Sequence, residues 1–205
     1  MIEQGTPEWF AQRLGKVTAS RVADVIAKTK TGYSTSRENY MAQLICERMT
    51  NTQAESFTNA AMQWGTETEP LARAAYEAAK DVLVDEVGFV PHPSIKMAGA
   101  SPDGLVGDDG LLEIKCPNTA THIDTLLSES VPTKYFTQMQ FQMACTGREW
   151  CDFVSIDNRL PEELQLFVKR VPRDDVYIRL IEAEIVQFIA ELDEKIEKLM
   201  KVKNV

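Results

Sequence analysis

The spacing of apolar residues changes twice along this chain of 205 residues, and the change limits the folds open to it. Up to about residue 80 the spacing is typical of helices, and between about 81 and 172 short extended runs replace it. Helical spacing then returns, with apolar side chains recurring from Val176 to Leu199. Strands framed by helices predict an α/β (α+β) fold, a central mixed sheet flanked by helices with a helical N-terminal third. The length suits one domain, 1–205.

Start signals for helices are concentrated before residue 80. A residue able to cap a helix precedes three segments, which are "PEWFAQRL" after Thr6, "SRVADVIAK" after Thr18 and "RENYMAQLICERM" after Ser36. The stretch "TKTGYST" is expected to be a polar loop. A longer helix is expected from about Asn59 to Lys80, bent or split near Gly65 or Pro70.

The middle of the chain is predicted to form strands. The runs "VLVDEVGFV", "IKMAGA", "LVG" and "LLEIK" are expected to be adjacent strands of one sheet, with the turn "SPDG" before the third. After helices near "TATHIDTLL" and from Lys134 to Thr146, two more strands are expected at "WCDFVSI" and "LQLFVKRV". The sheet core therefore covers about 81–172, and a C-terminal helix follows at about 173–200.

The net charge of −9 disfavours a nucleic-acid partner on its face, but the charge is unevenly distributed. Six basic residues against the single acid Asp24 give the segment 13–37 a balance of +5, so the rest of the chain carries −14. The basic residues are Arg13, Lys16, Arg21, Lys28, Lys30 and Arg37. Such a cluster is either a solvated helical surface or, beside a catalytic site, a surface for phosphates.

Several classes of protein gain no support from the sequence. No run of 18 apolar residues occurs, and the N-terminus has no signal-peptide pattern, so we expect a cytoplasmic protein with no membrane contact. The histidines, His92 and His122, and the four cysteines lack metal-ligand spacing, which leaves zinc sites and Ser-His-Asp triads unsupported and favours buried, reduced thiols. Any chemistry is therefore expected from carboxylates and lysines.

The segment "SPDGLVGDDGLLEIKCP", residues 101 to 117, places charged residues around an apolar strand. Glu113 and Lys115 share one face of that strand by its two-residue period, and Asp103 can meet them across the hairpin. Buried charges need partners or a metal. Two carboxylates and the Ile114 carbonyl are a sufficient protein share for Mg²⁺, which keeps several waters. The pattern favours a metal-dependent phosphodiesterase site.

An acid-x-lysine triplet is also frequent on exposed helices, where it has no catalytic meaning. The same pattern occurs at Asp193-Glu194-Lys195 within the expected C-terminal helix, and there we interpret it as a solvated face. The two triplets differ in context, since only Glu113-Ile114-Lys115 lies in an apolar strand behind a Pro-Asp-Gly turn. A structural pair and a catalytic site both remain open on the pattern alone.

Larger blocks of the sequence resemble a known family. Pro102-Asp103 followed by Glu113-Ile114-Lys115 is similar to the signature of restriction-endonuclease-like nucleases. The blocks "QRLGKVTASRVADVIAK", "WGTETEPLARAAYE", "SPDGL", "LEIKCP" and "YFTQMQFQM" resemble the lambda-type phage exonucleases, the YqaJ-like viral recombinase family. The resemblance covers most of the chain from about Gly5 to Met143. It implies a nuclease domain with a restriction-endonuclease-like fold.

The resemblance implies catalytic roles at the strand and its hairpin. Asp103, Glu113 and the Ile114 carbonyl would bind Mg²⁺. Two ions would be bound, and Mn²⁺ could replace them. Lys115 would position or deprotonate the attacking water. Glu69 would approach the metal site from a helix, although Pro70 directly follows it.

The resemblance also implies residues that contact DNA. Four would hold the 5′-phosphate of the degraded strand, namely Arg13, Ser20, Ser101 and Gln138. Ser20 is equally suited to capping a helix, and Gln140 is an alternative to Gln138. Lys30 would contact the duplex, while Met62 would either split the terminal base pair or belong to the core.

The function that the resemblance implies is a 5′-to-3′ exonuclease that is dependent on Mg²⁺. It would digest one strand of duplex DNA from an end and leave 3′ overhangs for recombination by strand annealing. Family likeness further implies a homotrimeric ring around DNA and a single-strand annealing protein as partner. Two alternatives remain open, which are a structure-specific or restriction-like endonuclease on the same fold and a catalytically idle adaptor that binds DNA ends.

Overall fold

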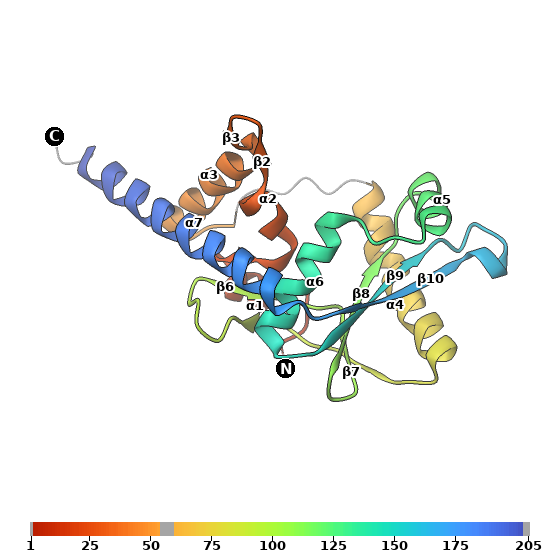
Figure 1. Cartoon of the computed structure of the whole chain (residues 1–205). Helices are drawn as coiled ribbons and strands as arrows, with labels where there is room; N and C mark the ends of the chain where they lie inside the picture. Colours follow the sequence, from red (N-terminus) through yellow and green to blue (C-terminus); the bar gives the residue numbers. More distant parts are fainter. Residues whose placement is uncertain (1, 54–59, 203–205) are drawn as a thin grey trace.

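A five-stranded mixed sheet, in the order β10-β9-β8-β7-β4, forms the centre of the chain in the computed structural model, which describes residues 2–53 and 60–202 (Figure 1). Its strands are β4 (Val84–Asp85), β7 (Gly104–Val106), β8 (Gly110–Lys115), β9 (Trp150–Ile156) and β10 (Leu166–Pro172). Strands β8 and β9 run parallel, and the other neighbours are antiparallel. Since a parallel pair needs a crossover, two helices lie between them, α5 (Thr119–Ser128) and α6 (Thr133–Thr146).

The two faces of this sheet are covered by different helices. Ala72 and Tyr76 of α4 (Ala60–Lys80) pack on one face in a cluster with Leu112 and Ile114 of β8. Met139 and Met143 of α6 pack on the other face against Leu111 of β8 and neighbouring residues of β9. Side chains of β8 therefore alternate between α4 and α6, and nearly all of them are buried because both faces are covered.

A second core lies among the helices at the two ends of the chain. It combines buried residues of α2 (Val22–Ile26), α3 (Thr35–Thr50) and α6 with the long α7 (Asp175–Val202), the blue helix that crosses this lobe in Figure 1. Shorter elements complete the lobe: α1 (Pro7–Arg13), the 3-10 turn Ala19–Arg21, and the hairpin of β2 (Lys28–Thr29) and β3 (Gly32–Tyr33). Another 3-10 turn, Glu162–Leu164, precedes β10.

A small three-stranded sheet lies apart from the main sheet and corrects one expectation. It has the order β1-β6-β5, from Val17–Thr18, Ala98–Ala100 and Val90–Pro91. The extended runs after residue 80 are thus divided between two sheets, because "IKMAGA" supplies β6, which pairs in parallel with β1 from the N-terminal lobe. A pairing across 80 residues is invisible to local patterns.

Several local expectations also differ from the structure. Helix α3 begins at Thr35 with Ser34 at its N-cap, so Ser36 lies inside the helix and does not cap it. Thr18 lies in β1 without a capping side-chain hydrogen bond, and the second helix ends at Ile26. The "TKTGYST" segment contributes to a hairpin, so it is only partly a loop. Helix α4 continues through Gly65 and Pro70, and Pro70 is exposed, so its ring projects from the outer side of the helix. Otherwise the mixed fold flanked by helices is confirmed.

Acidic residues of α7 pair with two of the six basic residues in the segment 13–37. Lys28 lies 2.6 Å from Glu184, and Arg37, which is almost fully buried, lies 2.7 Å from Glu191. These two positions are therefore paired and do not form a free surface for phosphates, and the buried Arg37 links α3 to α7. Lys30 remains exposed in the β2–β3 turn.

No helix in the part of the chain that the structure describes is long and apolar enough to cross a membrane.

Candidate active site

Asp103 directly precedes β7, and the β7–β8 hairpin brings it beside β8, as its spacing predicts. The Asp103 backbone N–H donates to the Leu112 carbonyl at 3.1 Å, and Asp103 Oδ2 accepts from the Ile114 N–H at 2.6 Å. The side chain of Gln4 supports the turn by donating to the Pro102 carbonyl at 2.8 Å. The Asp103 carboxylate thus accepts from the edge of β8 at a point that the backbone of β7 does not reach. This hydrogen bond fixes the position of the carboxylate.

Glu113 and Lys115 lie on the α6 face of β8 and form an ion pair. Glu113 is completely enclosed, whereas the Lys115 side chain keeps 26% of its surface exposed. Two amides of α6 also bind the Glu113 carboxylate, since Gln138 Nε2 donates to Oε1 and Gln142 Nε2 to Oε2, each at 2.6 Å. The buried acid is therefore surrounded by donors.

The electrostatics of this cluster follow from its burial and from like charges. Burial and the neighbouring Glu113 raise the pKa of Asp103 well above its usual range, even though Asp103 keeps some solvent contact. Burial opposes the charge on Lys115, but Glu113 and Asp103 outweigh it and raise the pKa of the ammonium. Burial, with Glu69 and Asp103 nearby, raises the pKa of Cys116 to about 12, so this thiol stays protonated. The raised pKa values of Asp103 and Glu69 show that these carboxylates lie in buried surroundings close to other negative charge. A bound cation would stabilise their charged forms.

Glu69 approaches the cluster from α4. Burial raises the pKa of its carboxyl, Arg73 opposes that rise, and Glu113 adds to it. Arg73 Nη2 lies 3.2 Å from Glu69 Oε1 one helical turn away, and Arg73 Nη1 also contacts Glu86. Glu69 is thus near the other acids and is held by Arg73 in the uninterrupted helix around Pro70.

The residues present fit a cation that needs few protein ligands. No group of three His, Cys, Asp or Glu with metal-binding geometry exists among the described residues, so a full protein cage is absent there. In a strand the N–H and C=O of one residue point to the same edge, so the Ile114 carbonyl faces the edge where its N–H meets Asp103. The paired part of β7 begins only opposite Leu112. Asp103, Glu113 and this carbonyl form an oxygen-rich set of the kind Mg²⁺ accepts.

A cavity of about 330 Å³ lies beside α1 and has a basic lining. Arg13, Lys16, Ser20 and Arg21 contribute to it, together with Glu47. Arg13 Nη1 and Trp9 Nε1 both donate to Ser101 Oγ at 3.0 Å, and the guanidinium lies over the Trp9 ring at 4.1 Å. Burial lowers the pKa of Arg13, and no ion pair involves it among the described residues. A half-buried guanidinium that no carboxylate of the described residues binds is suited to an anion, although Glu47 lies near enough to favour its charge.

The structure therefore brings together some of the residues expected to hold a phosphate. Arg13 and Ser20 line the same cavity, and Ser101, two residues before Asp103, connects it to the acidic cluster. Gln138 instead binds Glu113, and its rival Gln140 donates to the Pro172 carbonyl at 2.8 Å, which makes it structural. Lys30 belongs to the separate hairpin, and the Met62 side chain lies outside the described residues.

Two participants were missed by sequence reasoning. Trp9 packs under Arg13 and shares its partner Ser101, and Gln142 binds Glu113 from α6. The signal for Gln142 was the i, i+4 spacing with Gln138, which places both amides on one helical face.

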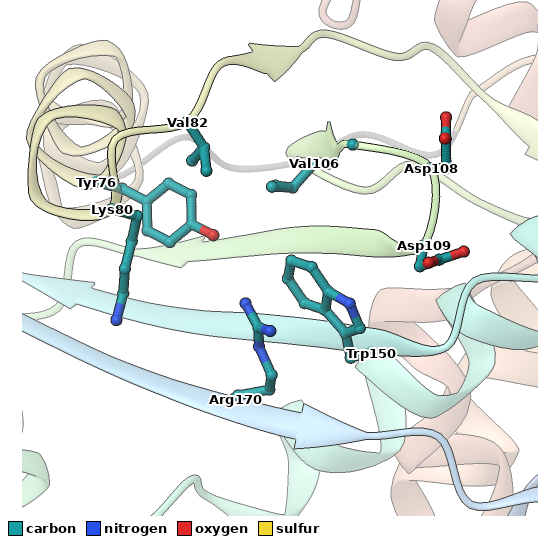
Figure 2. Close-up of a pocket in the computed structure, with 9 residues that line it drawn as sticks. Tyr76, Lys80, Val82, Val106, Asp108, Asp109, Trp150 and Arg170 are labelled. Carbon is teal, nitrogen blue, oxygen red and sulfur yellow. The ribbon is translucent and has the colours of Figure 1, made fainter.

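A larger cavity of about 370 Å³ lies on the α4 face of the sheet, and its lining includes Asp108 and Asp109 but neither Asp103 nor Glu113 (Figure 2). Trp150 covers Gly110 there, and Arg170 stacks on the Trp150 ring at 3.4 Å. Beneath it Asp152, almost fully buried, accepts two hydrogen bonds from Arg170 at 2.9 Å and one from the Tyr76 hydroxyl at 2.8 Å. This acid has its charge already paired, so we interpret the cluster as structural.

Comparison with known proteins gives a family and several relatives. The family model of the YqaJ-like viral recombinase domain matches residues 8–149. An uncharacterized protein of Acanthamoeba polyphaga mimivirus is 26% identical over 170 residues, which are 75% of this chain but 29% of that protein. The chain thus spans less than a third of that relative's length.

Solved structures give closer matches. An alkaline exonuclease from Laribacter hongkongensis is 57% identical, with a TM-score of 0.91 over 97% of this chain and 98% of that one. The same exonuclease in complex with dAMP matches with a TM-score of 0.92 at the same identity and coverage. A phage-related exonuclease from Haemophilus somnus 129PT shares the fold, with a TM-score of 0.74 over 90% of this chain and 96% of that one, at 16% identity.

Proposed function

Because the chain belongs to the YqaJ-like viral recombinase domain family, we propose that it degrades one strand of linear duplex DNA in the 5′-to-3′ direction, dependent on Mg²⁺. It is an enzyme of the phage exonuclease type, and its likeness to the alkaline exonuclease extends over nearly the whole chain. The direction, the metal and the product with a 3′ overhang are the parts proposed.

The observation that carries the proposal is the convergence of Asp103, Glu113 and Lys115 next to the Arg13 cavity. Asp103, Glu113 and the Ile114 carbonyl would hold Mg²⁺, with Mn²⁺ as a substitute and room for a second ion. Bound there, the ions supply an activated water and charge for the non-bridging and leaving oxygens. Lys115 would position that water, since the raised pKa of its ammonium opposes removal of a proton by this residue.

Polarity of digestion would follow from the place of Arg13. Ser101 connects Arg13 to the hairpin that carries Asp103, so a terminal phosphate held by Arg13 and Ser20 lies next to the acidic cluster. A strand bound by its 5′-phosphate presents its first phosphodiester to that cluster. Digestion then begins at the 5′ end and leaves the complementary strand as a 3′ overhang.

The assembly and partners are further parts of the proposal. A homotrimeric ring would hold the duplex by enclosing it, which offsets the repulsion expected from a chain of net charge −9. The family likeness suggests a single-strand annealing protein as the recipient of the overhang. Glu69 would support the metal site from α4, held by Arg73.

Digestion of linear and covalently closed circular duplexes, with Mg²⁺ or with EDTA, tests the activity. We expect acid-soluble nucleotides from the linear duplex with Mg²⁺ and none from the circle. Nicking of the circle would favour an endonuclease on the same fold. Retention of intact linear DNA by the protein in Mg²⁺ would favour the idle adaptor.

A further inference from the structure

Glu113 and Asp152 are buried acids of the same sheet, but different groups offset the cost of burying their negative charges. Asp152, opposite Leu112 on the neighbouring strand, is bound by the guanidinium of Arg170, a full positive charge. Glu113 receives two neutral amides from α6 in addition to the ammonium of Lys115. Amide donors offset the desolvation of a carboxylate without adding positive charge, so Lys115 is the one cation at Glu113 among the described residues.

The two oxygens of Glu113 have different surroundings. Oε1 faces Lys115, the partly exposed member of the cluster, and also accepts from Gln138. Oε2 accepts from Gln142, which is fully enclosed in α6. Gln142 therefore holds the carboxylate from the interior side, while the other oxygen is turned toward the open side of the site.

Gln142 also has a feature that stability does not explain. Its Oε1 is buried and has no hydrogen-bond partner among the residues that the structure describes, which is unfavourable inside a protein. Exchanging the two amide atoms would face this oxygen against the Glu113 carboxylate, so the orientation is fixed by chemistry. A glutamine that leaves its own acceptor unsatisfied is suited to one task, donation to Glu113.

We propose that Gln142 is a positioning residue for the metal-binding carboxylate of Glu113, an inference that rests on the proposed function. Its donation to Oε2 fixes the plane of the carboxylate. Because Lys115 and Gln138 both bind Oε1, a cation would take the remaining lone pair of Oε2 or replace Lys115 at Oε1. Residues behind a ligand commonly set metal affinity by about 10- to 100-fold. Gln142 acts through Glu113 and touches no substrate.

Gln140 provides a matched control on the same helix. It is also fully enclosed and makes two hydrogen bonds, one to the Pro172 carbonyl at 2.8 Å and one from the Asp174 N–H at 2.8 Å, but none to Glu113. Both Gln142→Leu and Gln140→Leu remove buried hydrogen bonds and destabilise the fold. Only Gln142→Leu removes a donor from Glu113.

The test measures the Kd for Mn²⁺ by calorimetry on the DNA-free protein, with folding checked by circular dichroism. We expect Gln142→Leu to raise that Kd by about 10- to 100-fold and Gln140→Leu to leave it near wild type. The Mg²⁺ concentration for half-maximal digestion should rise in parallel, with kcat largely recovered at saturating Mg²⁺. Should Gln142→Leu not fold, Gln142→Met keeps the shape of glutamine and carries the same test.

An unchanged Kd in a folded Gln142 variant, or an equal increase in Gln140→Leu, would overturn the positioning role. Wild-type protein that binds no Mn²⁺ and digests no DNA would instead refute the proposed function. The two failures are therefore distinguishable in one set of titrations.

Discussion

Removal of the Arg13 side chain should reduce the preference of the enzyme for ends that carry a 5′-phosphate. Ser101 engages one donor of Arg13, and this is its only side-chain hydrogen bond among the described residues, which leaves other donors free in the cavity. A charge-assisted hydrogen bond is worth about 1.5–3 kcal/mol, and each 1.4 kcal/mol is a factor of ten. Wild type should therefore prefer a 5′-phosphate over a 5′-hydroxyl end by about 10- to 140-fold in kcat/KM.

Initial rates on two duplexes that differ only in the terminal phosphate give this ratio. Arg13→Ala should bring the ratio close to one, mainly by loss of rate on the phosphorylated end. Arg21→Ala is the control, because Arg21 lines the same cavity but is bound to Asp24 at 2.6 Å and to Gln43 at 3.1 Å. Its ratio should stay near wild type. Equal loss on both ends in Arg13→Ala would make Arg13 structural and refute the reasoning.

Four other predictions concern the site, its stability and the assembly. Asp103→Ala and Glu113→Ala should each abolish nucleotide release but retain binding of DNA ends in a mobility-shift assay; substantial Mg²⁺-dependent release by either would contradict the ligand assignment. Lys115→Ala should lose digestion while its Kd for Mn²⁺ stays within a few-fold of wild type, and a lost metal site would make this lysine structural. Although burial opposes its charge, hydrogen bonds from Arg159 lower the pKa of Asp157 to about 2. Asp157→Asn should therefore reduce the free energy of unfolding by about 1–2 kcal/mol at pH 7, as measured by denaturant titration. The difference from wild type should vanish as pH falls from about 4 through about 2, because Asp157 then becomes protonated. A difference that does not change with pH would show that the charge of Asp157 does not stabilise the fold. Light scattering should give a trimer, and digestion once begun should continue after competitor DNA is added; a monomer with immediate arrest would rule out a ring.

Strand β8 and helix α7 could be predicted from the sequence because their signals are local. The run "GLLEIK" between turn residues specifies a buried strand, and the helical spacing of apolar residues after 173 specifies the long helix. The meeting of Asp103 with Glu113 was predictable for the same reason, since a short hairpin fixes which residues lie opposite each other.

Other features depended on contacts between distant segments. The pairing of Val17 with Ala98 and the ion pair of Arg37 with Glu191 join positions far apart in the chain, so no local pattern marks them. The contact of Gln138 with Glu113 depends on how α6 is rotated against the sheet, which packing decides. Charge along the sequence was a poor guide for the same reason, because Glu184 and Glu191 of α7 pair with Lys28 and Arg37 of the basic segment.

Digestion of a linear duplex labelled at either its 5′ or its 3′ ends, followed in one time course with Mg²⁺, measures the direction of degradation. We expect the 5′ label to be released at once as mononucleotide, while the 3′ label stays on long strands until late. Glu113→Ala should release neither label. Early release of the 3′ label by the wild-type protein, or equal release of both labels, would contradict the proposal. The 5′-phosphate would then not be the group that places the substrate strand at the metal site.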